Sequence, residues 1–264
     1  MTEYTTGHLT EHMTVQRSFR ACFCVAGLFL ASLLLAPLAL AQQAARAPQT
    51  AQAIAPFDIT GYWVSVVTED WRFRMVTPPK GDYNSVPLND AARKIADAWD
   101  PAKDEAEGNA CKAYGAPAIM RVPGRVHVTW QDPNTLKFEM DAGTQTRLFY
   151  FGAPQSHALD WQGTSKASWD MIAGPGNPAR GGSLEVVTTG MKPGYLRKNG
   201  VPYSAGAAVT EYYNRTEETN GDSWLVVTTI VDDPTYLATR FITSTHFKKQ
   251  ASAVGWAPSA CAAR

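Results

Sequence analysis

Residues 125–151 read RVHVTW QDPN TLKFEMD AGT QTRLFYF: three segments of alternating apolar and polar residues, separated by two short linkers. Alternation with a period of two is typical of half-buried β-strands, and both linkers are rich in turn-forming residues. Linkers this short join antiparallel neighbours, because parallel strands need a long crossover. The stretch therefore predicts an antiparallel β-meander.

Further segments with strand-like composition extend the meander on both sides. We predict additional strands at residues 59–67, 119–122, 183–189, 207–213, 224–231 and 240–248. The resulting set of about nine strands does not alternate with helices. A single, mainly β domain over residues 57–264 is therefore expected, built as one antiparallel barrel with one or two short helices.

The segments before and between the strands have their own signals. Asn89 is a good N-cap for a helix that reaches Trp99, and a second short helix is expected over residues 104–113. Residues 71–75 alternate apolar side chains with arginines, which predicts an extended segment. Residues 173–182 are rich in Gly and Pro and predict a mobile loop, either a lid or a simple insertion.

The first 41 residues have the pattern of a secretory signal. Arg17 and Arg20 precede an uncharged apolar run over residues 23–41, which ends in Ala-Leu-Ala. A basic start, an apolar run and a small-x-small end are typical of a cleaved signal, and an uncleaved membrane anchor is the alternative. We expect a flexible leader at residues 42–56 and an exported protein, periplasmic or extracellular, with no membrane span in the mature chain.

Charge and cysteine content narrow the classes of protein. The chain has 24 basic and 24 acidic residues, whereas a nucleic-acid-binding protein usually carries a broad positive surface. Removal of the signal leaves two cysteines, Cys111 and Cys261, which in an exported chain most simply form one disulfide. Two free thiols or a metal site are the alternatives, but the pair lacks the CxxC spacing of zinc sites. No metal and no cofactor are predicted.

The strand that begins Gly61-Tyr62-Trp63 and leads into an antiparallel meander resembles the first strand of the lipocalin and calycin barrels. The chain is also similar to a family of uncharacterised secreted bacterial proteins with a lipocalin-like barrel. The segments that carry this resemblance are TEDWRFRM (68–75), WDPAKDEA (99–106), GTQTRLF (143–149), YLRKNGVPY (195–203), VDDPTYL (231–237) and STHFKK (244–249). The resemblance implies a barrel, but it implies no reaction and supplies no catalytic residue.

A closed barrel of eight or nine strands can enclose one small ligand. The favoured function is therefore the binding of a small, partly apolar molecule. Arginine can hold a carboxylate or a phosphate with two parallel hydrogen bonds, although structural pairing with a nearby acid is the alternative. The candidate ligand-binding residues are Trp71, Arg72, Arg74, Arg121, Arg147, Tyr195, Arg197 and Tyr203.

The alternation of the strands leaves a second function open. If the polar faces point inward, His127, Glu139 and Asp141 form a pocket suited to proton transfer, and His246 can join them. An acid–base enzyme of the isomerase, dehydratase or hydrolase type is therefore the alternative. If the apolar faces point inward, these side chains face water. A third possibility is an envelope protein that acts through contacts with other proteins.

Overall fold

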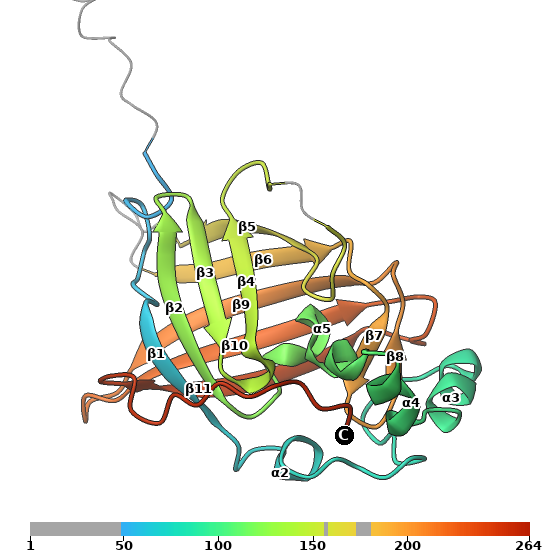
Figure 1. Ribbon diagram of the computed structural model, residues 1–264. Helices are drawn as coiled ribbons and strands as arrows, with labels where there is room; N and C mark the ends of the chain where they lie inside the picture. Colours follow the sequence, from blue (N-terminus) through green and yellow to red (C-terminus); the bar gives the residue numbers. More distant parts are fainter. Residues whose placement is uncertain (1–48, 156–157, 173–180) are drawn as a thin grey trace, which may run out of the picture. The chain divides into compact units, whose positions relative to one another are not determined.

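The computed structural model describes residues 49–155, 158–172 and 181–264, and within them nine strands close into a barrel (Figure 1). The strands follow the order β1-β11-β10-β9-β6-β5-β4-β3-β2 around the barrel. Their bounds are Gly61–Val66 (β1), Arg125–Asp132 (β2), Thr135–Met140 (β3), Gln145–Tyr150 (β4), Thr164–Met171 (β5), Gly182–Thr189 (β6), Ala208–Glu217 (β9), Ser223–Asp232 (β10) and Phe241–Gln250 (β11). The prediction of a mainly β barrel is confirmed. The predicted signal sequence and residues 173–180 of the predicted loop lie outside the described residues.

The apolar residues of the strands point into the barrel. In β2, Val126 and Val128 are buried, whereas His127 and Thr129 between them are partly exposed. The same alternation of buried and partly exposed residues runs through the whole of β10. Successive side chains of a strand point to opposite faces, so the period of two in the sequence becomes the inside and the outside of the barrel.

The barrel departs from a pure meander at one seam. Strands β4 and β5 run parallel and share only two register pairs, Phe149 with Ser165 and Tyr150 with Lys166. The other strand pairs of the barrel are antiparallel, as predicted. Tyr150 ends β4 and Thr164 begins β5, so the chain does not pass from one to the other by a short hairpin turn as it does between β3 and β4.

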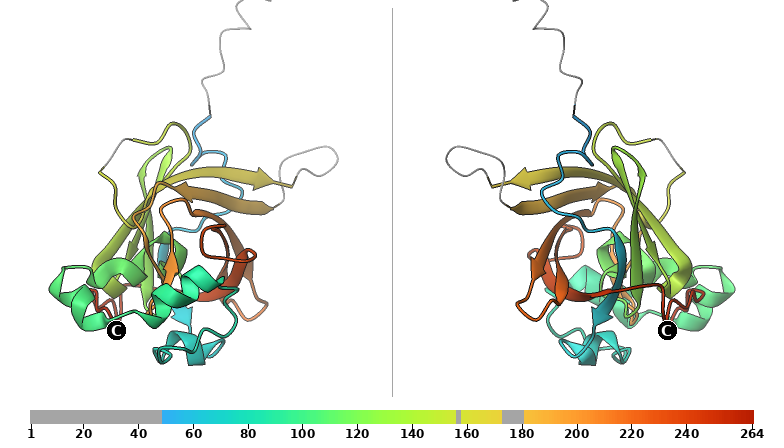
Figure 2. Two further views of the ribbon diagram at one scale, coloured as in Figure 1. Left: turned by 90° about the vertical axis from the view of Figure 1, so that its right-hand side faces the viewer. Right: turned by 90° about the vertical axis from the view of Figure 1, so that its left-hand side faces the viewer.

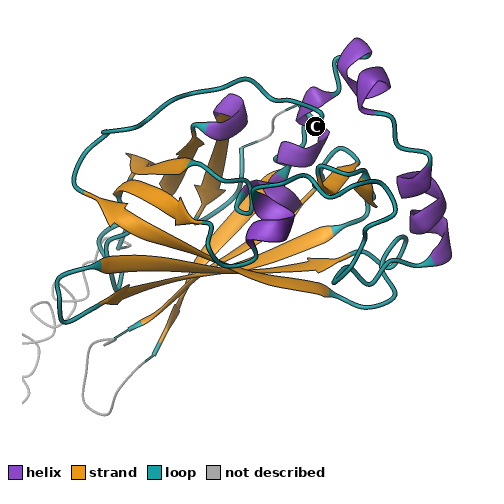
Figure 3. Cartoon of the chain, turned by 90° about the horizontal axis from the view of Figure 1, so that it is seen from below, coloured by secondary structure: helices purple, strands orange, loops and turns teal. Residues whose placement is uncertain are grey.

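Helical segments and a small hairpin pack together at one end of the barrel (Figures 2 and 3). The predicted helix at 89–99 is α3 (Asp90–Asp97), and the Asn89 side chain caps it by accepting a hydrogen bond from the Ala92 amide at 3.0 Å. The second predicted helix is divided into α4 (Pro101–Ala106) and the 3-10 helix η1 (Ala110–Tyr114).

The predicted strand at 119–122 is wrong, since the chain forms α5 (Ala116–Ile119) followed by a turn. Pro117 occupies the first turn of this helix, where its missing amide hydrogen costs no hydrogen bond. The hairpin of β7 (Gly194–Arg197) and β8 (Val201–Tyr203) was not predicted as strands. Its turn requires Gly200, which has a φ of 81° and lies where an added Cβ would be 2.3 Å from the Trp99 Cβ.

The predicted extended segment at 71–75 is also wrong, because residues Trp71–Arg74 form the short helix α2. Asp70 turns the chain just before it with a left-handed backbone conformation, at φ 59° and ψ 26°. Arg74 then reaches back, and its Nη1 donates to the Val66 carbonyl at 2.6 Å while its Nε donates to the Arg121 carbonyl at 3.0 Å. These contacts between distant segments override the local alternation.

The chain joins the folded unit earlier than the predicted leader allows. Ala51 is buried, its amide donates to the Asn134 side chain, and its carbonyl accepts a hydrogen bond from the Trp169 indole. The predicted flexible leader at residues 42–56 is therefore wrong over residues 51–54, because these residues form a turn that packs on the barrel. At the other end of the chain, the predicted disulfide between Cys111 and Cys261 is present.

Large side chains occupy the barrel interior. Trp63, Phe138, Phe149 and Tyr213 are fully buried and belong to one packed cluster. One hollow of about 470 Å³ reaches the buried side chains of Arg147 and Ser165. The candidate site described below is a different hollow, a surface groove at the end of the barrel, whereas the sequence led us to expect an enclosed cavity.

Candidate anion-binding groove

A surface groove of about 390 Å³ lies at the end of the barrel where β1 ends and β2 begins. Its walls come from residues 73–78, from η1, α5 and β7, and from residues 257–264, which we call the C-terminal strap. Five cationic side chains line it: Arg74, Arg121, Arg197, Lys198 and Arg264. No Asp or Glu is among the described residues that line this groove. Apolar atoms line it too, from Phe73, Met75, Val122 and Leu196.

Arg121 occupies the centre of the cationic cluster. It follows the turn after α5 and is only 7% exposed. One guanidinium nitrogen, Nη2, donates to Asp70 Oδ2 at 2.5 Å, and this is the ion pair that Arg121 makes in the structure. The Asp70 side chain is 39% exposed, so the pair bridges from the buried groove wall to solvent.

Arg74 and Arg197 flank Arg121, and each keeps one buried nitrogen without a hydrogen-bond partner. In Arg74 this nitrogen is Nη2, because Nε and Nη1 donate to backbone carbonyls. In Arg197 it is Nε, while Nη1 donates to the Asn84 carbonyl at 2.7 Å. The Arg197 guanidinium also lies 4.3 Å above the centre of the Phe73 ring, which holds it in place by a cation–π contact.

The three guanidinium groups repel one another in this buried setting. Burial, followed by the charge of Arg121, lowers the pKa of Arg74. The same two causes, in the same order, lower the pKa of Arg197 to about 10. The positive charges of the groove are therefore only partly compensated, and an anion placed among them would be strongly favoured.

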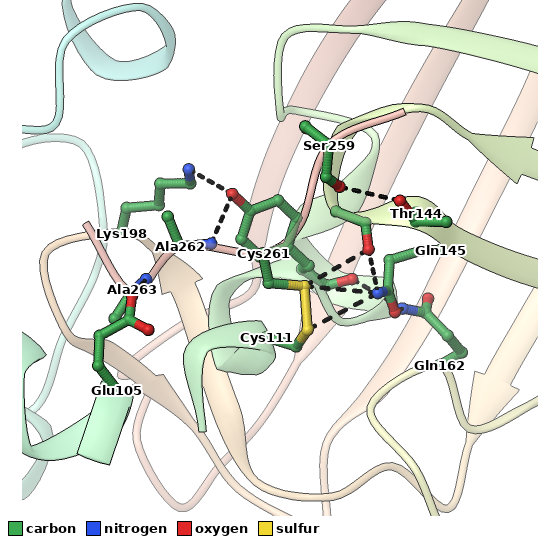
Figure 4. The surroundings of a disulfide bond; sticks show 12 residues. Glu105, Cys111, Thr144, Gln145, Gln162, Lys198, Ser259, Cys261, Ala262 and Ala263 are labelled. Atoms are coloured by element: carbon green, nitrogen blue, oxygen red, sulfur yellow. Dashed lines mark hydrogen bonds between the residues drawn. A yellow bond between two sulfur atoms is a disulfide. The ribbon is translucent and has the colours of Figure 1, made fainter. Parts of the chain in front are cut away.

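The C-terminal strap forms a wall of the groove and is fastened at several points (Figure 4). The disulfide joins Cys261 to Cys111 of η1. The Tyr114 hydroxyl accepts hydrogen bonds both from Lys198 Nζ at 2.6 Å and from the Ala262 amide at 3.3 Å. Because Lys198 has a neutral partner here, its charge adds to the positive potential of the groove.

The other predicted ligand-binding residues lie elsewhere. Arg72 points to solvent and pairs with Asp82, and Trp71 is exposed outside the groove. Tyr195 donates to Asp104 at 2.8 Å, and Tyr203 is buried in an apolar cluster between α3, the β7–β8 hairpin and the barrel strands. Of the eight candidates, the structure thus brings together Arg74, Arg121 and Arg197.

Arg147 lies inside the barrel in a separate network. Its Nη1 and Nη2 donate to the two carboxylate oxygens of Glu211 at 3.0 and 2.6 Å, and both side chains are fully buried. Nη2 also donates to Thr188, and Nη1 lies 3.4 Å from the Tyr213 hydroxyl. Burial disfavours the charge of Arg147, but Glu211 raises its pKa above the ordinary value. The charge of Arg147 is therefore compensated inside the barrel by Glu211, although its buried Nε has no hydrogen-bond partner.

The residues proposed for acid–base chemistry do not form a pocket inside the barrel, although two of them, His127 and Glu139, are neighbours on its outer face. His127 lies on the outer face, stacked on Tyr62, with its Nδ1 3.4 Å from Glu139 on the neighbouring strand. His246 is on the outer face as well and contacts Glu69. Asp141 is buried, but it accepts a hydrogen bond from the Arg125 amide, which is a structural role. The apolar-inward interpretation of the strands is the one that the structure shows.

Sequence reasoning missed Lys198, Arg264 and Met75 as groove residues. Lys198 directly follows Arg197 in the quoted segment YLRKNGVPY, so a pair of adjacent cations was a usable signal. Arg264 had no local signal, because the disulfide brings the strap to the groove. Met75 had none either, because the turn at Asp70 places the end of α2 there.

In residues 49–155, 158–172 and 181–264, no three His, Cys, Asp or Glu side chains lie close enough together to hold a metal ion. The described helices are all too short or too polar to span a membrane. Comparison with protein-family models, with curated proteins and with solved structures found no match to this chain.

Proposed function

We propose that the protein is an exported, lipocalin-like binding protein that holds a small, partly apolar anion in the groove centred on Arg121. One observation carries the proposal: three buried guanidinium groups from three separate segments line one groove, and of the three only Arg121 is bonded to a carboxylate, that of Asp70. Buried charges without partners are costly, so proteins that keep them usually compensate them with a ligand or a counter-ion.

The composition of the groove suggests the kind of anion. Arginine recognises planar carboxylates and phosphates through paired hydrogen bonds. The Arg121 guanidinium donates through Nη2 to Asp70, which leaves its other nitrogens to bind an anion. Met75, Val122 and Leu196 supply an apolar wall beside the cations. A ligand with one anionic group and a short apolar body would match both parts, and the apolar pocket with a few polar groups is a common form of small-molecule site.

The proposal is tested by titrating the folded chain with inorganic phosphate, acetate and succinate in a calorimeter. We expect binding of at least one of them, and Arg121→Gln should weaken it by about tenfold or more, since a hydrogen bond to a charged group contributes roughly 1.5–3 kcal/mol. Arg121→Lys should recover part of the affinity because it keeps the charge.

Arg93→Gln is the matched control, because Arg93 is an exposed cation on α3 that does not line the groove. The Arg93→Gln variant should bind the same anions with the affinity of the parent protein. Absence of binding to all three anions up to about 10 mM, a concentration that reveals even weak sites, would rule the proposal out. So would an equal loss of affinity in the Arg93 and Arg121 variants, provided that both retain the circular dichroism of the parent.

A further inference from the structure

An exposed apolar strip adjoins the groove. Trp71, Met75 and Val76 are 58%, 55% and 57% exposed, although they are large apolar side chains. Trp71 and Met75 are four residues apart across the single turn of α2, so they share one face of it. Several large apolar side chains exposed side by side mark a contact surface, whereas isolated ones are ordinary.

The strip is continuous with the cationic groove, because Met75 belongs to both. A molecule whose charged end lies at Arg121 therefore has an apolar path out of the groove along α2. The groove volume of about 390 Å³ is enough for a head group and a few carbon atoms, but a longer chain would have to leave it. The strip lies where such a chain would emerge.

The charges of the groove indicate the charge of the head group. Arg74, Arg121 and Arg197 carry three positive charges, and Asp70, which is bonded to Arg121, offsets one of them. Lys198 and Arg264 also line the groove, so the excess is at least two positive charges. The next acids also act on the cluster, Glu69 on Arg74 and Asp82 on Arg197, but Glu69 contacts His246 and Asp82 pairs with Arg72. An anion with two negative charges would balance this excess.

We propose that the groove and the strip together bind one molecule of an anionic amphiphile whose head group carries two negative charges, such as a phosphate monoester of an apolar alcohol. This inference rests on the proposed function, and it adds the head-group charge and the apolar chain. The occupant is a single molecule and not a membrane surface: the chain has 24 basic and 24 acidic residues, and such a balance gives little attraction to an anionic bilayer.

Calorimetric titration at pH 8 with four soluble probes tests the inference: octyl phosphate, inorganic phosphate, octanoate and octanol. Octyl phosphate should bind about tenfold or more tightly than inorganic phosphate, because each CH₂ group taken out of water contributes roughly fourfold in affinity. It should also bind about tenfold more tightly than octanoate, because a phosphate monoester has lost its second proton well below pH 8. Octanol should not bind.

The double variant Trp71→Ser/Val76→Ser separates the strip from the groove. It should reduce the affinity for octyl phosphate towards that for inorganic phosphate and leave inorganic phosphate binding unchanged, since neither residue lines the groove. Ile242→Ser is the control, because Ile242 is similarly exposed at 60% but lies on β11. It should bind octyl phosphate like the parent.

The outcomes distinguish the two proposals. Equal affinities for octyl phosphate and inorganic phosphate would overturn the role of the strip, and equal affinities for octyl phosphate and octanoate would overturn the doubly charged head group. In both cases anion binding in the groove would stand. If none of the probes binds, both proposals fail. Binding to anionic phospholipid vesicles without binding to soluble octyl phosphate would also contradict the inference.

Discussion

Two buried arginines in this barrel have opposite electrostatic surroundings. Arg147 lies in the barrel interior, where Glu211 accepts two hydrogen bonds from it and Thr188 accepts a third. Arg121 lies at the barrel end, where it bonds to Asp70 through one nitrogen and is flanked by Arg74 and Arg197. The sequence contains no local difference between them, so the difference arises from what the fold places around each.

The comparison separates a structural charge from a binding charge. A buried arginine whose charge is balanced by a buried carboxylate gains little from a ligand, and its removal leaves the partner charge uncompensated. A buried arginine among other cations is poorly compensated until an anion arrives. We therefore expect changes at the Arg147 pair to act on folding, and changes at the Arg121 cluster to act on binding.

The largest effect is expected from Glu211→Gln. Both side chains of the Arg147–Glu211 pair are 0% exposed, so the substitution leaves a guanidinium charge buried without a carboxylate. We expect a loss of about 3–5 kcal/mol in the free energy of unfolding, measured by urea denaturation.

The double variant Arg147→Met/Glu211→Leu is the control for that measurement. Removing both charges should restore most of the lost stability, because no uncompensated ion remains. A loss below about 1 kcal/mol in Glu211→Gln would show that the pair is not the structural element described above.

The next largest effect should follow from removing the disulfide. Cys111 and Cys261 are 150 residues apart, and opening a loop of this length costs about 2–4 kcal/mol of stability in typical cases. In Cys111→Ser/Cys261→Ser the C-terminal strap loses its covalent anchor. The two groove residues that it carries, Ser259 and Arg264, are then held less firmly in the groove wall. We expect weaker phosphate binding together with the lower stability.

Hydrogen exchange shows whether this effect is confined to the groove. Under native conditions, amides of β4 and β9 beside the Arg147 pair should keep their protection, while the amides of Ser259 and Ala262 should lose it, because these two are bonded to the barrel and to Tyr114. Equal loss of protection in both regions would mean that the strap supports the whole barrel. It would contradict the expectation that removing the disulfide affects the groove and not the surroundings of Arg147.

The strands that sequence reasoning found are those in which large apolar residues alternate with polar ones. In β10 every second residue is buried and three of these five are apolar, and in β2 the buried Val126 and Val128 alternate with polar residues, so the pattern can be read from the sequence. Strand β5 was missed because its inward residues are small or polar, such as Ser165 and Ala167. Ser165 points inward because its hydroxyl bonds to Thr188, beside the buried ion pair, and only the fold brings these two together.

The type of candidate site, arginines that bind an anion, could be predicted from the sequence, but its position in the fold could not. Arginine side chains were expected to bind an anion, and three of them do line the groove. The sequence could not separate these from Arg147 and Arg72, because their counter-ions, Glu211 and Asp82, are 64 and 10 residues away along the chain. Charge compensation is a property of the tertiary structure.

The smallest effect, and the one that tests the comparison most directly, is expected from Asp70→Asn. The Asp70 carboxylate competes with any bound anion for Arg121, so its neutralisation should raise the affinity for phosphate by about two- to fivefold, as an ion pair at a partly exposed position contributes roughly 0.5–1 kcal/mol. Asparagine tolerates the left-handed backbone at this position, with its φ of 59°, as well as aspartate does. Calorimetric titration measures the change.

The sign of this change decides between two roles for Asp70. If Asp70 holds Arg121 in place, as Glu211 holds Arg147, its neutralisation would let Arg121 move out of position. The affinity for phosphate would then fall, as in Arg121→Gln. An increase in affinity identifies Asp70 as a counter-ion that the ligand displaces. Arg93→Gln again serves as the control, because it removes an exposed charge that does not line the groove, and it should leave the affinity within about twofold of the parent.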